Sequence, residues 1–254
     1  ALAQRYAEER EKRIRFDAET QFVQLSHDSP FANKYLEEDP YSETLERAPL
    51  KDQREVIVIG GGWVGMLTAA RLSQAGISDV RIVESGSDFG GTWYWNRYPG
   101  ARFDSESYTY GYSFSKDILN EWHWKERFSP QHETLQYLNY VVDRMGLRDY
   151  MQFGCKVDEM IFDDDTDTWS LSLQDGRTIT TRIVITALGP LSTPTLPNFE
   201  GMKDFQGVSF HPHHWPHELK DLTGKRVAII GTGATAIQII PEVAKQAGQL
   251  TVFQ

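Results

Sequence analysis

A glycine-rich turn between two apolar runs constrains the fold of this chain more than any other feature. The turn, Gly60-Gly61-Gly62-Trp63-Val64-Gly65, directly follows the β-branched run 55–59. Apolar residues then recur at helical spacing over 63–75, and a second strand is predicted over 79–84. A strand, a glycine turn, a helix and a strand in this order form the βαβ unit that binds dinucleotides.

The glycines of this turn have separate predicted tasks. Gly60 allows the tight turn, Gly62 lets the backbone approach a pyrophosphate, and Gly65 lets the helix pack against the strand. The N-terminus of the helix offers free N–H groups and the positive end of its dipole to phosphate. Glu84, at the end of the second strand, is placed to accept hydrogen bonds from a ribose. The alternative is a glycine turn that holds no ligand.

A second unit of the same kind is predicted near the end of the sequence. A strand over 226–230 leads into the turn 231–236, a helix is expected over 237–247, and the next strand begins at Leu250. Ala236 stands where the first unit has its third glycine. The predicted fold class is α/β, with two Rossmann-like dinucleotide-binding units, the second incomplete in this chain, and an N-terminal helical extension.

The region between the two units is predicted to complete the first one. An amphipathic helix over 131–146 ends at a glycine, and three strands follow over 157–162, 169–173 and 178–185. Before them, residues 89–104 are too rich in glycine and proline for a helix.

Residues 89–104 are predicted to be a loop with aromatic side chains that can wall a flat ring, namely Trp93, Trp95 and Tyr98. Glycines in such a loop permit the close approach of backbone to a ligand. The alternative is a packed structural loop with a surface ion pair, for which Arg102 and Asp104 supply the two charges.

Composition excludes several classes of function. A net charge of −10 over 254 residues speaks against nucleic acid or an anionic membrane surface as the main partner. Cys155 is the single cysteine, so neither a disulfide framework nor a CxxC pair exists, which predicts a reducing, cytoplasmic location. No run of 18 apolar residues is present, so no membrane span is expected.

The first residues are charged throughout, which argues against a signal peptide. Residues 1–17 predict an exposed helix with pairs of Glu and Arg at helical spacing. Residues 18–53 carry several prolines and are expected to pack on a neighbour or to wrap the body, without a catalytic role.

Two longer patterns resemble the type I Baeyer–Villiger monooxygenases, a branch of the flavin-dependent monooxygenases. The family pattern FxGxxxHxxxW followed by Pro or Asp is met at Phe205, Gly207, His211, Trp215 and Pro216. The pattern GGxWxxxxYPGxxxD is met at Gly90, Gly91, Trp93, Tyr98, Pro99, Gly100 and Asp104. With the two glycine turns, the resemblance covers roughly residues 53–254.

The resemblance implies that the first unit binds FAD and the second binds NADPH. The FAD contacts that it implies are Gly60, Gly62, Gly65, Glu84, Gly91, Thr92, Trp93, Tyr94, Trp95, Asp104, Tyr110 and the backbone of Val157. Residues that would also face the nicotinamide are Arg102, Phe103 and Asp104, and Asp104 takes a catalytic role by orienting an arginine expected beyond Gln254. The NADP pyrophosphate would be held by Thr232, Gly233, Ala234, Thr235, Ala236, Ile237 and Gln238.

The same resemblance implies the reaction and the organisation of the chain. NADPH-reduced FAD would activate O₂ as a C4a-peroxyflavin, which inserts one oxygen beside a ketone carbonyl to give an ester or lactone. The expected parts are an N-terminal extension (1–53), an FAD-binding domain (54–190), a connector (191–224) and the start of an NADP-binding domain (225–254). The 2′-phosphate-binding residue is expected beyond Gln254.

Other functions stay open at this point. They are a flavin monooxygenase that oxidises nitrogen or sulfur, a disulfide reductase, which the missing cysteine pair disfavours, and an inactive cofactor-binding fragment. The histidines of 211–217 make a zinc site a weaker alternative, because proline breaks the helical spacing of ligand pairs. His211 and Trp215 are instead expected to hold a hinge between the two cofactor sites.

Overall fold

The computed structural model describes residues 2–12, 14, 22–25, 39–42, 53–216, 219 and 221–254. The chain divides into two compact units, one formed by Ala1–Glu38 with Thr193–His211 and the other by Asp39–Ser192 with Pro212–Gln254. One division between the units therefore falls directly after His211, inside the segment that carries the FxGxxxHxxxWP pattern.

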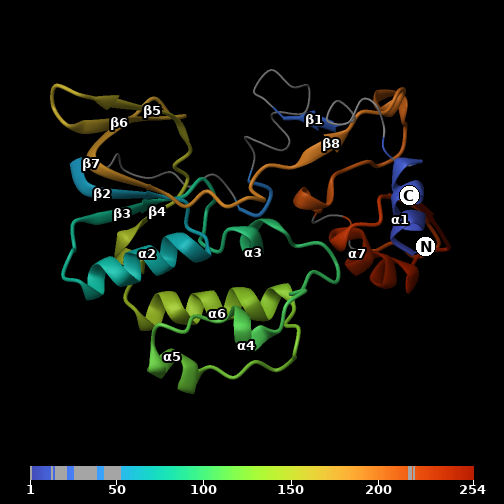
Figure 1. The fold of residues 1–254 in the computed structure, drawn as a ribbon, viewed down its shortest axis with the longest axis horizontal. Coiled ribbons are helices and arrows are strands. Elements are labelled where there is room, and N and C mark those ends of the chain that lie inside the picture. Colours follow the sequence, from blue (N-terminus) through green and yellow to red (C-terminus); the bar gives the residue numbers. More distant parts are fainter. Residues whose placement is uncertain are drawn as a thin grey trace. The chain divides into compact units, whose positions relative to one another are not determined.

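A six-stranded mixed sheet forms the centre of the larger unit (Figure 1). Its strand order is β4-β3-β2-β7-β6-β5. The first four strands pair in parallel, and β7, β6 and β5 pair antiparallel. The bounds are β2 Gln53–Ile59, β3 Val80–Val83, β4 Met151–Gln152, β5 Val157–Asp163, β6 Thr168–Leu173 and β7 Thr178–Thr186. The predicted parallel βαβ unit and the three later strands are confirmed.

Strand β2 is buried on both faces, which explains its unbroken β-branched sequence. Successive side chains of a strand point to opposite faces. Val56 and Val58 accordingly join the core beneath the helices, whereas Ile57 and Ile59 pack with residues of β6 and β7. The antiparallel strands thus cover one face of the parallel sheet and the helices cover the other.

Two longer helices supply that helical layer, and they lie on the same side of the sheet (Figure 1). They are α2 (Trp63–Gln74) and α6 (Gln131–Arg144). Helix α6 ends as predicted before Gly146, whose φ of +63° is a conformation that glycine adopts readily. The shorter helices are α3 Thr92–Trp95, α4 Ser107–Tyr110, α5 Lys116–Glu121 and η3 Arg148–Tyr150.

The prediction that residues 89–104 contain no helix is wrong at α3. Gly90 and Gly91 have φ of +132° and +54°, so the glycines lie just before the helix and leave its interior free of them. The glycines and the proline of the segment lie before and after the four helical residues, not among them. A composition rule applied to the whole window therefore missed one short turn of helix.

The second predicted βαβ unit is also present in the larger unit. Strands β9 (Arg226–Ile230) and β10 (Gln249–Phe253) pair in parallel. Helix α7 (Ala234–Ala244) connects them in the sequence. Helix α7 begins and ends three residues earlier than predicted, and it contains Pro241. Leu222, Ile239 and Val243 form its small core, and Trp215 of the FxGxxxHxxxWP pattern packs against them. A short helix, η5 (Pro212–His214), precedes Trp215.

The smaller unit contains helix α1 (Leu2–Glu11), the short helix η4 (Met202–Asp204) and the antiparallel strands β1 (Phe22–Gln24) and β8 (Thr195–Pro197). The predicted N-terminal helix is confirmed over α1, which has no buried residue. Most of the predicted extension lies outside the described residues. Among the described residues, no helix combines the length and the apolar character that crossing a membrane needs.

The close approach of α2 to the first turn generates a prediction. A Cβ at Gly65 would lie 1.9 Å from the carbonyl oxygen of Gly60, a backbone atom that cannot move aside cheaply. Gly65→Ala is therefore expected to destabilise the protein by about 1–3 kcal/mol or more in urea unfolding. The matched variant Ala236→Gly, at the corresponding position of α7, should cost only about 1 kcal/mol of helix propensity. Equal losses for the two variants would contradict the assigned packing role.

Candidate functional site

The first glycine turn is locked by backbone contacts on two sides. Gly60 has a φ of +108°, and a Cβ there would lie 2.5 Å from the carbonyl oxygen of Ala187, just after β7. Gly65 approaches Gly60 from α2, as described above. The predicted turn and packing roles of these two glycines are therefore seen directly in the structure.

A second glycine pair lies against the first turn. A Cβ built on Gly91 would come within 2.8 Å of the Gly62 Cα, and the Gly90 amide donates to the Gly61 carbonyl at 3.0 Å. Gly62 is the N-cap of α2 and Gly91 that of α3, and neither helix start has a side-chain cap. The N-terminus of α2 thus keeps N–H groups without side-chain acceptors, which is the arrangement that binds phosphate.

Glu84 lies at the end of β3, buried beside this turn. One carboxylate oxygen accepts from the Gly61 amide at 2.7 Å, and the other accepts from the Gly86 amide at 2.8 Å. Burial raises the pKa of Glu84, although both amides and the Ser85 hydroxyl oppose that shift. The carboxylate therefore ties the turn to the loop after β3, and the ribose contact predicted for it remains a prediction.

The aromatic residues around α3 differ in what they offer a ligand. Trp93 and Tyr94 are buried, and the Trp93 ring packs edge-on against Phe103 at 4.9 Å between centroids. Phe103 in turn stacks on Tyr110 at 4.0 Å. The Trp93 indole packs in the core, and its predicted contact with a flat ring remains a prediction. Thr92 is exposed.

Among the described ion pairs, Arg102 has a partner other than Asp104, with which the alternative interpretation of this loop had paired it. The Arg102 guanidinium lies 3.3 Å from Glu126, which sequence reasoning had not singled out. Asp104 is exposed, and burial raises the pKa of Tyr98 and of Tyr110, with the Asp104 charge adding to both shifts. Asp104 is therefore close enough to influence both phenols.

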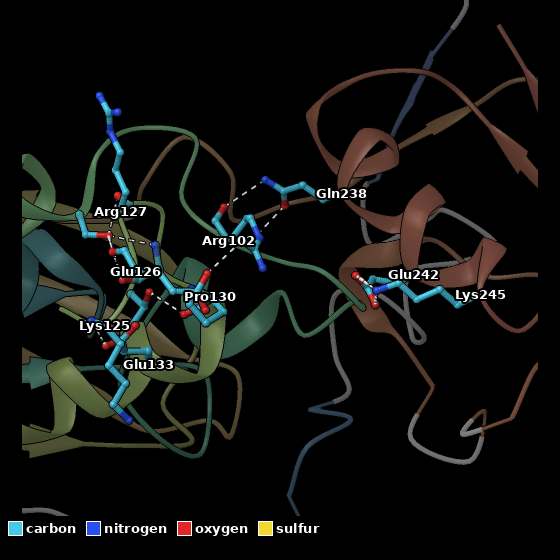
Figure 2. A network of polar contacts seen from close by, with 12 residues as sticks. Arg102, Lys125, Glu126, Arg127, Pro130, Glu133, Gln238, Glu242 and Lys245 are labelled. Atoms are coloured by element: carbon cyan, nitrogen blue, oxygen red, sulfur yellow. Dashed lines mark hydrogen bonds and ion pairs between the residues drawn. The ribbon is translucent and has the colours of Figure 1, made fainter.

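The second turn faces the loop that follows α3. The Gln238 side chain accepts from the Tyr98 hydroxyl at 3.0 Å and from the Arg102 amide at 3.3 Å, and it donates to the Arg102 carbonyl at 3.1 Å. Figure 2 shows Gln238 reaching from α7 to Arg102. A Cβ at Gly100 would lie 2.3 Å from the Gln238 carbonyl oxygen, so this loop packs closely on α7.

The rest of the predicted pyrophosphate-binding set occupies the start of α7. Thr232, Gly233 and Ala234 are exposed, and Gly233 caps the helix without a side-chain acceptor. Thr235 is half-buried, Ala236 is buried and Ile237 is exposed. The structure gives Gln238 a contact with the 98–102 loop that the sequence did not indicate.

Val157 begins β5 and pairs with Leu173 in the hairpin. It lies two residues beyond Cys155, whose amide donates to the Glu84 carbonyl at 2.8 Å, so Val157 is connected to the first turn through Glu84. Its backbone contact with an adenine remains a prediction.

Two of the three histidines that follow His211 lie in the described part of the chain. His213 and His214 are buried and stack on each other and on Trp95. In the described part of the chain, no group of three His, Cys, Asp or Glu residues is placed to hold a metal ion. His217 lies outside the described residues.

Two hollows lie apart from the predicted site residues. One, of about 490 Å³, has walls that include Gly111, Trp122, Trp124 and Tyr137. The other, of about 290 Å³, lies beside the first residues of β2. Neither is lined by a predicted site residue.

Sequence reasoning missed the residues that support the site from a distance. Gln131 donates to the Trp93 carbonyl, and Asp39 accepts from the Tyr94 hydroxyl. Neither residue belongs to a motif, and each acts on a partner far along the chain. Only the folded arrangement reveals them.

Comparison with known proteins places this architecture in a family. Residues 57–254 match the family model described as pyridine nucleotide-disulphide oxidoreductase. The chain therefore belongs to the pyridine nucleotide-disulphide oxidoreductase family. Within it, the similar proteins confirm the resemblance to type I Baeyer–Villiger monooxygenases.

Three similar proteins differ in what their names say they oxidise. A Baeyer–Villiger monooxygenase of Streptomyces coelicolor is 38% identical over all of this chain and 42% of its own length. A phenazine N-monooxygenase of Lysobacter antibioticus is 42% identical over 80% of this chain and 38% of its own length. The structure of a polycyclic ketone monooxygenase from Thermothelomyces thermophila superposes with a TM-score of 0.89 at 33% identity, covering 100% of this chain and 44% of that one.

The chain spans about two fifths of the length of the curated relatives that it matches.

The two hydrogen bonds that the Glu84 carboxylate accepts, from the Gly61 and Gly86 amides, lead to a prediction. In Glu84→Gln the amide group has one acceptor oxygen for two backbone donors, so either Gly61 or Gly86 loses its partner. We expect a loss of on the order of 1–3 kcal/mol in urea unfolding of the FAD-free protein at neutral pH. The control is Glu121→Gln, which changes a surface carboxylate beside Arg144. Its free energy of unfolding should hardly differ from that of the wild type. A neutral effect of Glu84→Gln would show that the carboxylate does not hold the turn.

Proposed function

We propose that this chain forms the FAD-binding part and the beginning of the NADPH-binding part of a Baeyer–Villiger monooxygenase. The observation that carries the proposal is the pair of glycine turns, each opening an uncapped helix, with the GGxWxxxxYPGxxxD loop between them. That loop touches the first turn through Gly91 and touches α7 through Gly100.

FAD fits the residues of the first turn. The start of α2 and the neighbouring backbone of Gly62 and Gly91 suit a pyrophosphate, because the helix start has no side-chain cap and neither glycine carries a side chain. Glu84 retains acceptor capacity for a ribose, since a carboxylate has about four lone-pair sites and two amides and the Ser85 hydroxyl occupy only part of them. Thr92, Trp95, Asp104, Tyr110 and the Val157 backbone are assigned to the rest of the cofactor.

NADPH is assigned to the second turn. Thr232, Gly233 and Ala234 are exposed at the start of α7, where backbone N–H groups suit a pyrophosphate. Arg102, Phe103 and Asp104 lie on the loop that Gln238 holds against α7. We assign to this loop the nicotinamide side of the site, with Phe103 contributing through its backbone because its ring is buried.

When bound, FAD supplies the activation of O₂ that a ketone oxygenation needs. The protein residues bind and orient both cofactors and exclude water from them. Asp104, exposed near Tyr98 and Tyr110, is placed to hold a cationic group by charge. The substrate is a ketone, the product is an ester or lactone, and the single cysteine fits a cytoplasmic location.

Oxidation of nitrogen is the second candidate, because one of the similar proteins is named as a phenazine N-monooxygenase. The FxGxxxHxxxWP pattern favours the ketone reaction. A disulfide reductase is disfavoured because the chain has no second cysteine to pair with Cys155.

The proposed activity is tested with the purified protein. We expect a flavin absorbance spectrum, NADPH oxidation that ketones stimulate, and an ester or lactone identified by mass spectrometry. An amine or phenazine that stimulates NADPH oxidation and yields an N-oxide, while ketones do not, would favour the second candidate. A protein that binds no flavin would contradict both.

The hinge role of His211 and Trp215 gains support from the division of the chain. Trp215 packs on the core of α7, and the boundary between compact units falls directly after His211. We propose that the 205–216 segment couples movement between these parts to cofactor binding.

His211→Ala tests this coupling. We expect the rate of flavin reduction by NADPH to fall about tenfold, which corresponds to ~1.4 kcal/mol in the barrier. The exposed residue His132 on α6 gives the control variant His132→Ala, which should react at the wild-type rate. If His211→Ala leaves flavin reduction and ketone oxygenation unchanged, the hinge role is wrong.

A further inference from the structure

A short piece of the N-terminal extension, residues 39–42, contacts the loops of the first glycine turn. It belongs to the same compact unit as those loops. The contacts involve the segment 85–87 after β3, helix α3, and Arg97 beyond it. From the sequence, this piece was expected to have no catalytic role.

Asp39 joins two segments of the candidate FAD site. Its Oδ2 atom accepts from the Ser87 amide at 2.9 Å and from the Tyr94 hydroxyl at 2.6 Å. Ser87 follows Glu84 closely, whereas Tyr94 lies in α3. A single carboxylate oxygen thus fixes the spacing between the loop assigned to the ribose and the helix assigned to the rest of the cofactor.

Asp39 is ionised at neutral pH. Burial favours its protonated form, but hydrogen bonds from Tyr94, Tyr41 and Ser87 outweigh burial and lower its pKa below the ordinary value. Charge-assisted hydrogen bonds of this kind are about twice as strong as neutral ones.

Tyr41 makes the second attachment. Its hydroxyl donates to the carbonyl of Trp95, the last residue of α3, at 2.7 Å. The carbonyl of His213 lies 3.4 Å from the same hydroxyl. Burial raises the pKa of Tyr41 to about 12, so this donor keeps its proton. Tyr41 therefore binds the last carbonyl of α3 at a half-buried helix end and lies beside the segment that leads into Trp215.

Arg97 completes the contact by covering both phenol rings. Its Cζ lies 4.1 Å from the centroid of the Tyr41 ring and 4.7 Å from that of Tyr94, and its Nε donates to the Tyr94 carbonyl at 2.8 Å. Cation–π contacts of this geometry stabilise a partly buried cluster.

We propose that Asp39 and Tyr41 are positioning residues for the FAD site, which clamp α3 and the 85–87 loop at the spacing that the cofactor requires. The inference rests on the proposed binding of FAD. It assigns to the N-terminal extension a role in cofactor affinity, exerted through Tyr94, Trp95 and Ser87.

The test measures FAD binding by titration of the deflavinated protein. Asp39→Ala is expected to raise Kd about tenfold, which corresponds to ~1.4 kcal/mol. Tyr41→Phe removes one hydroxyl and should raise Kd about threefold, or ~0.7 kcal/mol. The Kd of Asp39→Asn should lie between those of the wild type and Asp39→Ala, because the amide oxygen of asparagine still accepts from Tyr94 and Ser87. The flavin absorbance spectrum should shift in the same order.

The controls separate positioning from general stability. Asp117→Ala and Tyr140→Phe remove surface partners of Arg144 and Glu121 and should leave Kd unchanged. If Asp39→Ala does not fold, Tyr41→Phe and Asp39→Asn carry the test. If the folded variants bind FAD with the wild-type Kd, the positioning role alone is overturned, even if their unfolding midpoints fall. A wild-type protein that binds no FAD overturns the proposed function and the positioning role together.

Discussion

Glu84 is the residue on which the arrangement of the first dinucleotide turn depends. Its carboxylate accepts from Gly61 on one side and from Gly86 on the other. Its main chain donates to Gln152 and accepts from Cys155. One buried residue therefore joins the turn after β2, the loop after β3 and the chain around β4. Because a carboxyl group is costly to bury without partners, these hydrogen bonds are needed to hold it there.

The main elements of the fold could be predicted because their signals are local. Apolar periodicity and glycine spacing located β2, α2 and the β9–α7–β10 unit to within a few residues. The supporting contacts could not be predicted in the same way. Asp39 binds partners 48 and 55 positions away, and no spacing rule connects them. The packing of the Trp93 ring in the core could not be predicted for a related reason, since the sequence of a loop does not show which way an aromatic side chain faces.

The two motif patterns that suggested the family meet different physical needs. The GGxWxxxxYPGxxxD loop contains glycines where backbone touches backbone, at Gly91 and Gly100. The FxGxxxHxxxWP segment instead crosses from one compact unit to the other, with Trp215 anchored in the core of α7. The glycines of the first pattern allow close packing of the backbone. The second pattern spans the point in the sequence where one compact unit ends and the other begins.

The first glycine turn leaves no room for a side chain at two of its positions. Backbone oxygens lie within 3 Å of the Cβ positions of Gly60 and Gly65. Any side chain larger than hydrogen at either position would push one backbone segment away from another, so the path of the chain through this turn depends on what these two residues lack.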